Sequence, residues 1–143
     1  MQGSDPDESL GYHCNLTVRA FLGAWEGKLK GTGVSQAQLV ALAQLVGAGP
    51  LSQAELVKRL SITPATGVRL VDRMERDGWV TRRPDPTDGR VNLVVPTKRA
   101  VDVWEQLSRS GRRVLEQAYR GIPPEELEKV KLILAKVRKN LKE

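Results

Sequence analysis

Residues 51–97 decide the fold of this chain and read LSQAELVKRLSITPATGVRLVDRMERDGWVTRRPDPTDGRVNLVVPT. A first helix is predicted after Ser52, whose hydroxyl can cap it, with a glutamate three residues later to complete a capping box. A second helix is predicted to begin at Pro64 with Thr63 as its N-cap, because proline has no N–H to leave unpaired there. Gly78 should end it, since glycine tolerates the left-handed backbone conformation. Two short helices joined by a tight turn are typical of a helix-turn-helix.

The second helix has two different faces. Four residues fall together on the side that we expect to be buried: Gly67, Leu70, Val71 and Met74. The other side carries small residues near its start and then three arginines: Ala65, Thr66, Arg69, Arg73 and Arg76. Small residues let a helix enter a DNA major groove, and arginine can pair with phosphates or with the O6 and N7 atoms of guanine. This face therefore predicts a DNA recognition helix.

After the second helix the apolar pattern changes to that of strands. Trp79–Arg83 and Arg90–Val95 are predicted strands, and the Asp88-Gly89 pair between them is a strong turn signal. Arginines on this hairpin, the wing, are placed to reach a minor groove or the DNA backbone. The candidate DNA-binding residues are therefore Thr63, Pro64, Ala65, Thr66, Arg69, Arg73, Arg82, Arg83, Asp88 and Arg90.

These residues resemble the MarR family of bacterial and archaeal winged-helix regulators. The resemblance is carried by LSQAELVKRL, TPATGVRLVDRMERDGWV and RRPDPTDGR, the last of which contains the family's Asp-x-Arg wing motif as Asp88-Gly89-Arg90. The segment GIPPEELEKVKLILAKV at 121–137 is similar to the SlyA-like branch. The chain departs from the family pattern in three places, one of which is that the glycine usual after the wing is absent from Lys98-Arg99-Ala100. Gly67 replaces a larger residue, which would allow close helix packing, and Pro96-Thr97 replaces Leu-Thr, which leaves the exit of the wing open.

Helical spacing continues on both sides of this region. We predict a mainly α fold with a small β wing, in which a winged helix-turn-helix occupies about residues 34–97. N- and C-terminal dimerisation helices at about 10–30 and 98–141 flank it, and the 143 residues form a single MarR-type domain. Before residue 97, Ser35 and Gln38 predict a second capping box.

The last helix carries an apolar seam that a winged-helix core would leave uncovered. The seam residues recur at steps of three and four: Leu127, Val130, Leu134, Val137 and Leu141. A homodimer would cover them, and packing of the first and last helices within one chain is the alternative. In a dimer, two recognition helices about one DNA turn apart would read a palindromic operator in double-stranded DNA.

Composition narrows the classes of function. The net charge of +6 is distributed as −1 over residues 1–50, +2 over 51–97 and +5 over 98–143. A basic balance favours polyanionic partners, although a solvated helix surface explains the last third equally well. No apolar run is long enough for a membrane, and a single cysteine excludes a disulfide framework and suits a cytoplasmic protein. The sequence has one histidine and no phosphate-binding loop. We therefore expect that the chain is not an enzyme and has no metal or cofactor site.

The resemblance implies a small amphipathic or phenolic effector, held between the dimerisation helices and the winged helix. Trp25 and Trp104 are candidates to line such a site, although large apolar residues on these stripes more often belong to a core. The alternatives are a winged helix used only for protein assembly and a thiol-based redox sensor acting through Cys14. Cys14 lies on an apolar stripe with little cationic support, so we expect no redox role. The sequence leaves repression and activation equally open.

Overall fold

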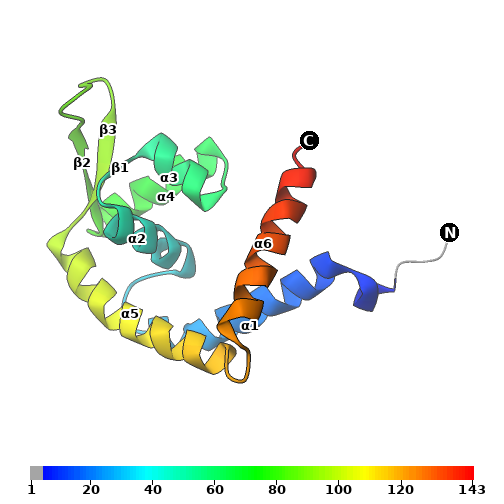
Figure 1. The fold of residues 1–143 in the computed structure, drawn as a ribbon. Helices are drawn as coiled ribbons and strands as arrows, with labels where there is room; N and C mark the ends of the chain where they lie inside the picture. Colours follow the sequence, from blue (N-terminus) through cyan, green and yellow to red (C-terminus); the bar gives the residue numbers. More distant parts are fainter. Residues whose placement is uncertain (1–4) are drawn as a thin grey trace. The chain divides into compact units, whose positions relative to one another are not determined.

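The computed structural model describes residues 5–143 and confirms a mainly helical fold with a small antiparallel sheet (Figure 1). In chain order the elements are η1 (Pro6–Glu8), α1 (Leu10–Leu29), α2 (Gln36–Ala48), β1 (Leu51–Ser52), α3 (Gln53–Leu60), α4 (Pro64–Arg76), β2 (Val80–Pro84), β3 (Asn92–Pro96), α5 (Lys98–Ala118) and α6 (Pro124–Asn140). The chain divides into two compact units, one ending at Gly111 and one formed by residues 112–143. The boundary falls inside α5, so this helix contributes to both units.

The core of the first unit lies where α2, α3, α4 and the sheet pack together with the start of α5. Its fully buried large side chains come from these helices and strands, from the middle of α5 and from the turn before β2: Trp79, Leu42, Leu45, Leu56, Met74, Leu107, Val71, Val80 and Val94. Full burial of one aliphatic side chain contributes about 1.5–3 kcal/mol, so these residues dominate the stability of the winged helix. Leu70, predicted for the buried face of α4, is only half-buried at the edge of this core.

The sheet contains one strand that the sequence did not predict. Its strand order is β1-β3-β2, and both pairs are antiparallel. In the added strand, Leu51 pairs with Val94 and Ser52 with Leu93. Ser52 still caps α3, since its hydroxyl accepts the N–H of Glu55 at 3.1 Å, but the return contact that would complete a capping box is not formed. The residue before a helix cap thus also serves as a short strand, which helix signals alone do not reveal.

Close approach of α3 and α4 depends on a glycine. A Cβ atom on Gly67 would collide with Cγ2 of Val57, which lies on α3. Gly67 is itself buried within α4. The expectation that this glycine allows close helix packing is therefore confirmed, and the packing accounts for a residue that by itself lowers helix stability.

The exit of the wing is fixed by Thr97. Its N–H donates to the carbonyl of Trp79 at 3.0 Å, and its hydroxyl donates to the carbonyl of Gly78 at 2.8 Å. The same hydroxyl oxygen accepts the N–H of Ala100 at 3.2 Å and so caps α5. Thr97 thus joins the end of β3 to the start of β2 and begins the next helix, which settles the geometry that the departure from the family pattern left open.

The second unit contains the last turns of α5 and all of α6. Between them Gly121 has φ of +77°, a conformation that glycine adopts without strain, and the N–H of Ile122 donates to the carbonyl of Tyr119 at 3.0 Å. Helix α6 then begins at Pro124 with Glu125 and Glu126 in its first turn, where their charges suit the helix dipole. None of its residues is buried.

Candidate nucleic-acid interface

The start of α4 is built for exposure of its polar face. The Thr63 hydroxyl accepts the N–H of Thr66 at 3.2 Å, and Pro64 occupies the first turn. The preceding turn contains Ser61 in the left-handed region with φ of 53°, which reverses the chain between α3 and α4. Ala65 and Thr66 are exposed at the N-terminal end of α4. The predicted small-residue surface therefore exists and is open to a partner.

The three arginines of α4 differ in what they contact. Arg69 and Arg73 are exposed, and neither pairs with a carboxylate among residues 5–143. The Nε atom of Arg69 makes a long hydrogen bond of 3.4 Å to the carbonyl of Ala65, so this side chain lies along the helix toward its N-terminus. Arg76 instead pairs with Asp77 at 3.3 Å. Arg69 and Arg73 are thus the two cations of this helix that remain available to an anionic partner.

Arg82, predicted to bind DNA, turns onto the recognition helix. Its Nη2 lies 2.7 Å from Oδ1 of Asp72 and its Nη1 lies 2.9 Å from Oε1 of Glu75. Nη2 also donates to the amide oxygen of Gln53 at 3.4 Å. The Arg82 side chain is 24% exposed, against 61% for Asp72 and 46% for Glu75. Arg82 therefore connects β2 to α4 and α3 through its side chain and is not a free cation.

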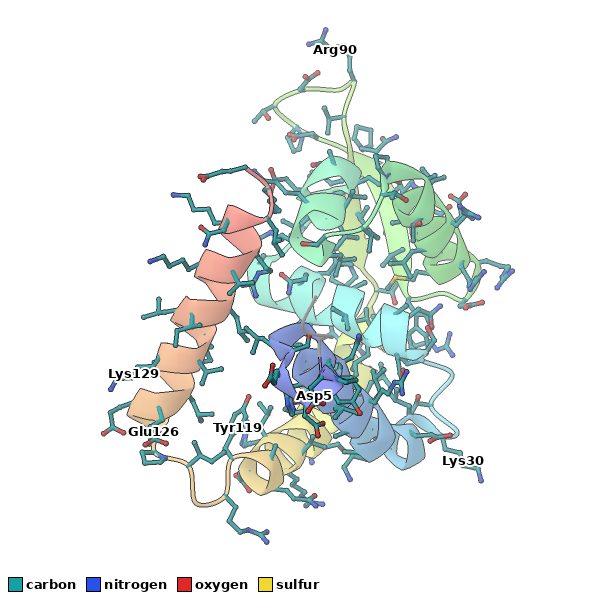
Figure 2. All side chains as sticks on the ribbon, turned by 90° about the vertical axis from the view of Figure 1, so that its right-hand side faces the viewer. Asp5, Lys30, Arg90, Tyr119, Glu126 and Lys129 are labelled. Carbon is teal, nitrogen blue, oxygen red and sulfur yellow. The ribbon has the colours of Figure 1, made fainter. Side chains whose placement is uncertain are left out.

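The tip of the wing presents Arg90. Figure 2 shows this side chain projecting from the end of the hairpin, and it is 92% exposed. Its Nε lies 3.1 Å from Oδ1 of Asp88, which also accepts the backbone N–H of Arg90 at 3.1 Å. These two hydrogen bonds hold the pKa of Asp88 below its usual value. Arg83, also predicted to bind DNA, is exposed on β2.

The loop behind the tip is stabilised by a second aspartate. Oδ1 of Asp85 accepts both the N–H and the hydroxyl of Thr87 at 2.8 Å, which lowers the pKa of Asp85. The N–H of Val91 donates to the carbonyl of Asp88 at 3.0 Å. Because this turn includes Arg90 and Val91, strand β3 begins at Asn92, two residues later than predicted. The wing therefore has an ordered tip that fixes the base of the Arg90 side chain.

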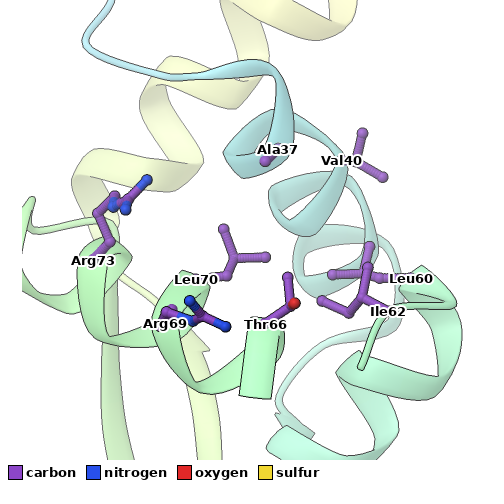
Figure 3. Close-up of a pocket in the computed structure, with 8 residues that line it drawn as sticks. All are labelled: Ala37, Val40, Leu60, Ile62, Thr66, Arg69, Leu70 and Arg73. Carbon is purple, nitrogen blue, oxygen red and sulfur yellow. The ribbon is translucent and has the colours of Figure 1, made fainter. Parts of the chain in front are cut away.

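A hollow of about 490 Å³ lies beside the recognition helix (Figure 3). Its apolar lining comes from α2, from the end of α3 and its following turn, and from α4: Ala37, Val40, Leu60, Ile62 and Leu70. Thr66, Arg69 and Arg73 complete the lining from α4. The same two arginines thus border both the exposed face of α4 and an apolar depression.

The two tryptophans predicted to line an effector site pack against the core of the first unit. Trp25 contacts α5 closely, because a Cβ atom on Gly111 would lie 2.9 Å from Cζ2 of its ring. A second hollow lies between α1 and the start of α2 and is lined by Gly23, Glu26, Gly27, Leu29, Lys30, Val34, Ser35 and Gln36. Trp25 and Trp104 line neither of these two hollows.

The predicted dimerisation seam lies on a helix without buried residues. Leu127, Leu134 and Val137 are half-buried, whereas Val130 is 51% and Leu141 82% exposed. Two further apolar residues of α6, absent from the predicted seam, are strongly exposed: Leu132 and Ile133. Helix α1 also exposes Leu10, Tyr12, Leu16, Val18 and Leu22. The run of apolar residues at 132–134 was the sequence signal for the wider exposed apolar surface of α6.

Neither a metal centre nor a membrane span is found in the part of the chain that the structure describes. No group of three or more His, Cys, Asp or Glu side chains in residues 5–143 could hold a metal ion. Within the same range, every helix is too short or too polar to cross a bilayer.

Comparison with known proteins finds relatives and solved structures that are transcriptional regulators. A model of the MarR family matches residues 32–91. The uncharacterized HTH-type transcriptional regulator YdgJ of Bacillus subtilis is 31% identical over 77% of this chain and 67% of its own length. A mutant MarR from E. coli, crystallised with operator DNA, has a TM-score of 0.78 at 26% identity, covering 90% of this chain and 92% of its own. CouR from Rhodococcus jostii, bound to p-coumaroyl-CoA, has a TM-score of 0.84 at 21% identity over 94% of each chain, which shows a shared fold alone.

The winged helix and its exposed arginines define a helix-turn-helix transcriptional regulator. The chain belongs to the MarR family. The matched proteins are transcriptional regulators, in agreement with the prediction that this chain is not an enzyme.

Proposed function

We propose that this chain is a sequence-specific regulator that binds double-stranded DNA as a homodimer on a palindromic operator and responds to a small effector. The exposed face of α4 carries the proposal: Arg69 and Arg73 pair with no carboxylate among residues 5–143, while Arg90 extends from the wing. A helix of this kind reads base edges in the major groove, and a wing cation contacts the minor groove or phosphates. The remaining candidates, Thr63 to Thr66, Arg83 and Asp88, would position or flank these contacts.

The test is selection of a binding site from random duplex DNA, followed by titration at several salt concentrations. Arg69→Ala should weaken binding to the selected site by about 1–3 kcal/mol if it makes a bidentate contact to guanine. Arg109→Ala is the matched control, because it removes the same charge from an exposed position on α5. A wild-type protein without salt-sensitive DNA binding would instead support the assembly-module alternative.

A second copy of the chain is the partner that we propose for α6. The helix is 17 residues long, exposes the apolar side chains of Val130, Leu132 and Ile133 between its charged residues, and fully buries none of its residues. Exposed apolar surface of this extent is typical of an interface. Replacing Leu134 and Val137 with glutamate would place unpaired charge in that interface, so light scattering should detect monomers. Lys136→Glu adds negative charge elsewhere on α6 and should leave the dimer intact. A stable wild-type monomer would refute both the dimer and the palindromic site.

We propose that the effector is a small amphipathic or phenolic molecule. PcaV from Streptomyces coelicolor was crystallised with its natural ligand, and DNA binding by BpsR from Bordetella bronchiseptica is regulated by 6-hydroxynicotinic acid; both share the fold of this chain at 21% identity. In this chain the hollow beside α4 offers an apolar lining bordered by the Arg69 and Arg73 guanidinium groups. An anionic amphipathic molecule bound there would occupy the cations that we assign to DNA. Trp25 and Trp104 remain the sequence-based candidates for a site nearer α1 and α5.

The proposal extends to the branch of the family, the domain organisation and the cellular location of this protein. We place the chain in the SlyA-like branch because residues 121–137 are similar to it. We treat the winged helix and its flanking helices as one functional domain, since the DNA-reading and dimerising surfaces act together on a palindrome. Because its proposed target is chromosomal DNA, we assign the protein to the cytoplasm.

A further inference from the structure

The C-terminal end of the recognition helix is held by two other helices. Asp77 is the C-cap of α4. Its Oδ2 accepts a hydrogen bond from Nε2 of Gln38 at 3.0 Å, and Gln38 lies in the first turn of α2. The backbone carbonyl of Asp77 accepts a hydrogen bond from Nη1 of Arg99 at 2.6 Å, and Arg99 lies in the first turn of α5. The Arg99 guanidinium also stacks over the ring of Trp79 at 4.0 Å. The last turn of α4 is therefore fixed to the starts of both α2 and α5.

Gln38 has an environment that requires an amide. It is the buried polar side chain of the described core, only 2% exposed. Its Oε1 accepts the N–H of Ser35 at 3.1 Å, which completes the capping box of α2, while its Nε2 donates to Asp77. Glutamine and glutamate serve equally well in a capping box. A glutamate here would meet the carboxylate of Asp77, so the contact with Asp77 explains why this position carries an amide.

Asp77 also controls one cation of the DNA-facing surface. While Oδ2 accepts from Gln38, Oδ1 pairs with Nε of Arg76 at 3.3 Å. The charged groups around this carboxylate are Arg76 and Arg73 from α4 and Arg99 from α5, which binds the carbonyl of the same residue. The hydrogen bond from Gln38 is the largest cause that holds the pKa of Asp77 below its usual value, because it stabilises the ionised carboxylate.

We propose that Gln38 is a positioning residue for DNA binding, which fixes the orientation of the recognition helix through Asp77. The inference rests on the proposed function of α4 as the DNA-reading helix. A helix of this length spans about 20 Å, so a tilt of about 3° at its C-terminal end moves its N-terminal residues by about 1 Å. Base contacts need tighter placement than that. Gln38 touches no DNA in this proposal; it acts by holding the helix that does.

The test is Gln38→Glu, with Gln44→Glu as the control on the same helix. At pH 7.5 the introduced carboxylate repels Asp77, and affinity for the selected site should fall on the order of tenfold relative to wild type. Burial and the neighbouring Asp77 carboxylate raise the pKa of the introduced glutamate. As the pH is lowered toward 5.5, it should therefore become a neutral acid whose O–H donates to Asp77, and affinity should return toward the wild-type value at the same pH. Gln44→Glu should show neither change. The ratio of specific to non-specific affinity is measured with each.

This ratio separates positioning from folding. A variant that is only less stable would show a lower Tm with an unchanged ratio for the folded protein, which would overturn the proposal. Asp77→Ala is the second variant, because it removes the partner of Gln38 at the half-buried end of α4. It should lower the specific affinity at pH 7.5 without recovery at pH 5.5. Wild-type-like specific binding by both variants would refute the inference alone, whereas a wild-type protein without DNA binding would refute the proposed function and this inference together.

Discussion

Removal of the Arg82 side chain tests whether this cation contacts DNA or positions the recognition helix. Its guanidinium forms two ion pairs with α4, at 2.7 Å to Asp72 and 2.9 Å to Glu75. Buried hydrogen bonds to charged groups contribute about 1.5–3 kcal/mol each. Both carboxylates are about half exposed or more, so the value for surface pairs of about 0–1 kcal/mol is the better guide for each contact. We expect Arg82→Met to lower the free energy of unfolding by about 1–2 kcal/mol, measured by urea denaturation.

The same substitution should weaken DNA binding, because it leaves Asp72 and Glu75 uncompensated on the recognition helix. Adding Asp72→Asn and Glu75→Gln removes those charges, so the triple variant should regain most of the lost affinity. If Arg82 instead contacts a phosphate directly, the triple variant stays weak and the slope of log K against log salt falls by about 1. Persistent weakness of the triple variant would therefore refute the positioning role that we infer from the ion pairs.

Three further predictions follow from particular contacts. Gly67→Ala should lower stability, because overpacking against Val57 costs about 1–3 kcal/mol and exceeds the helix-propensity gain of about 1 kcal/mol. The control Gly47→Ala places its Cβ in open space and should raise Tm. Stabilisation by both substitutions would contradict the packing argument. Arg90→Ala should reduce DNA affinity with Tm unchanged, and NMR titration should show the pKa of Asp88 rising toward its usual value; an unchanged Asp88 pKa would mean that the pair is not formed in solution. Cys14→Ser should retain DNA binding, and peroxide should not release the wild-type protein from its site, since this half-buried thiol lies on an apolar stripe; release that depends on Cys14 would make the protein a thiol switch.

Local sequence signals predicted most of the fold. Thr63, Pro64 and Gly78 bound α4 as expected, because caps and breakers act within one turn of the helix end. The capping box at Ser35 also forms. Strand β1 was missed because its two residues depend on pairing with β3, about forty residues later in the chain. A pattern of neighbouring residues contains no information on such a pairing.

Contacts between distant residues were also what the sequence could not predict in the candidate site. Spacing on α4 placed Arg69 and Arg73 on the exposed face, since helical geometry relates neighbouring residues directly. The sequence also placed Arg82 on the wing as a candidate DNA-binding residue. The fold brings Arg82 onto Asp72 and Glu75 through the hairpin, and no period in the sequence encodes that contact. Gln38 was assigned only its local role as a cap for the same reason, although its other hydrogen bond reaches Asp77.

The arginines of the winged helix and of the start of α5 fall into two groups, those that bind groups of α4 or its cap and those that are exposed. Arg82 and Arg76 are paired with carboxylates of α4 and its cap, and Arg99 binds the backbone at the end of the same helix. Arg82 thereby joins the wing to the recognition helix and Arg99 joins α5 to its end, whereas Arg76 makes only a local pair. Arg69 and Arg73 remain on the exposed face of α4, and Arg90 extends from the wing beside Asp88. Of the cations in residues 51–97, Arg69, Arg73 and Arg90 are therefore exposed on the recognition helix and the wing, where a polyanionic partner would contact them.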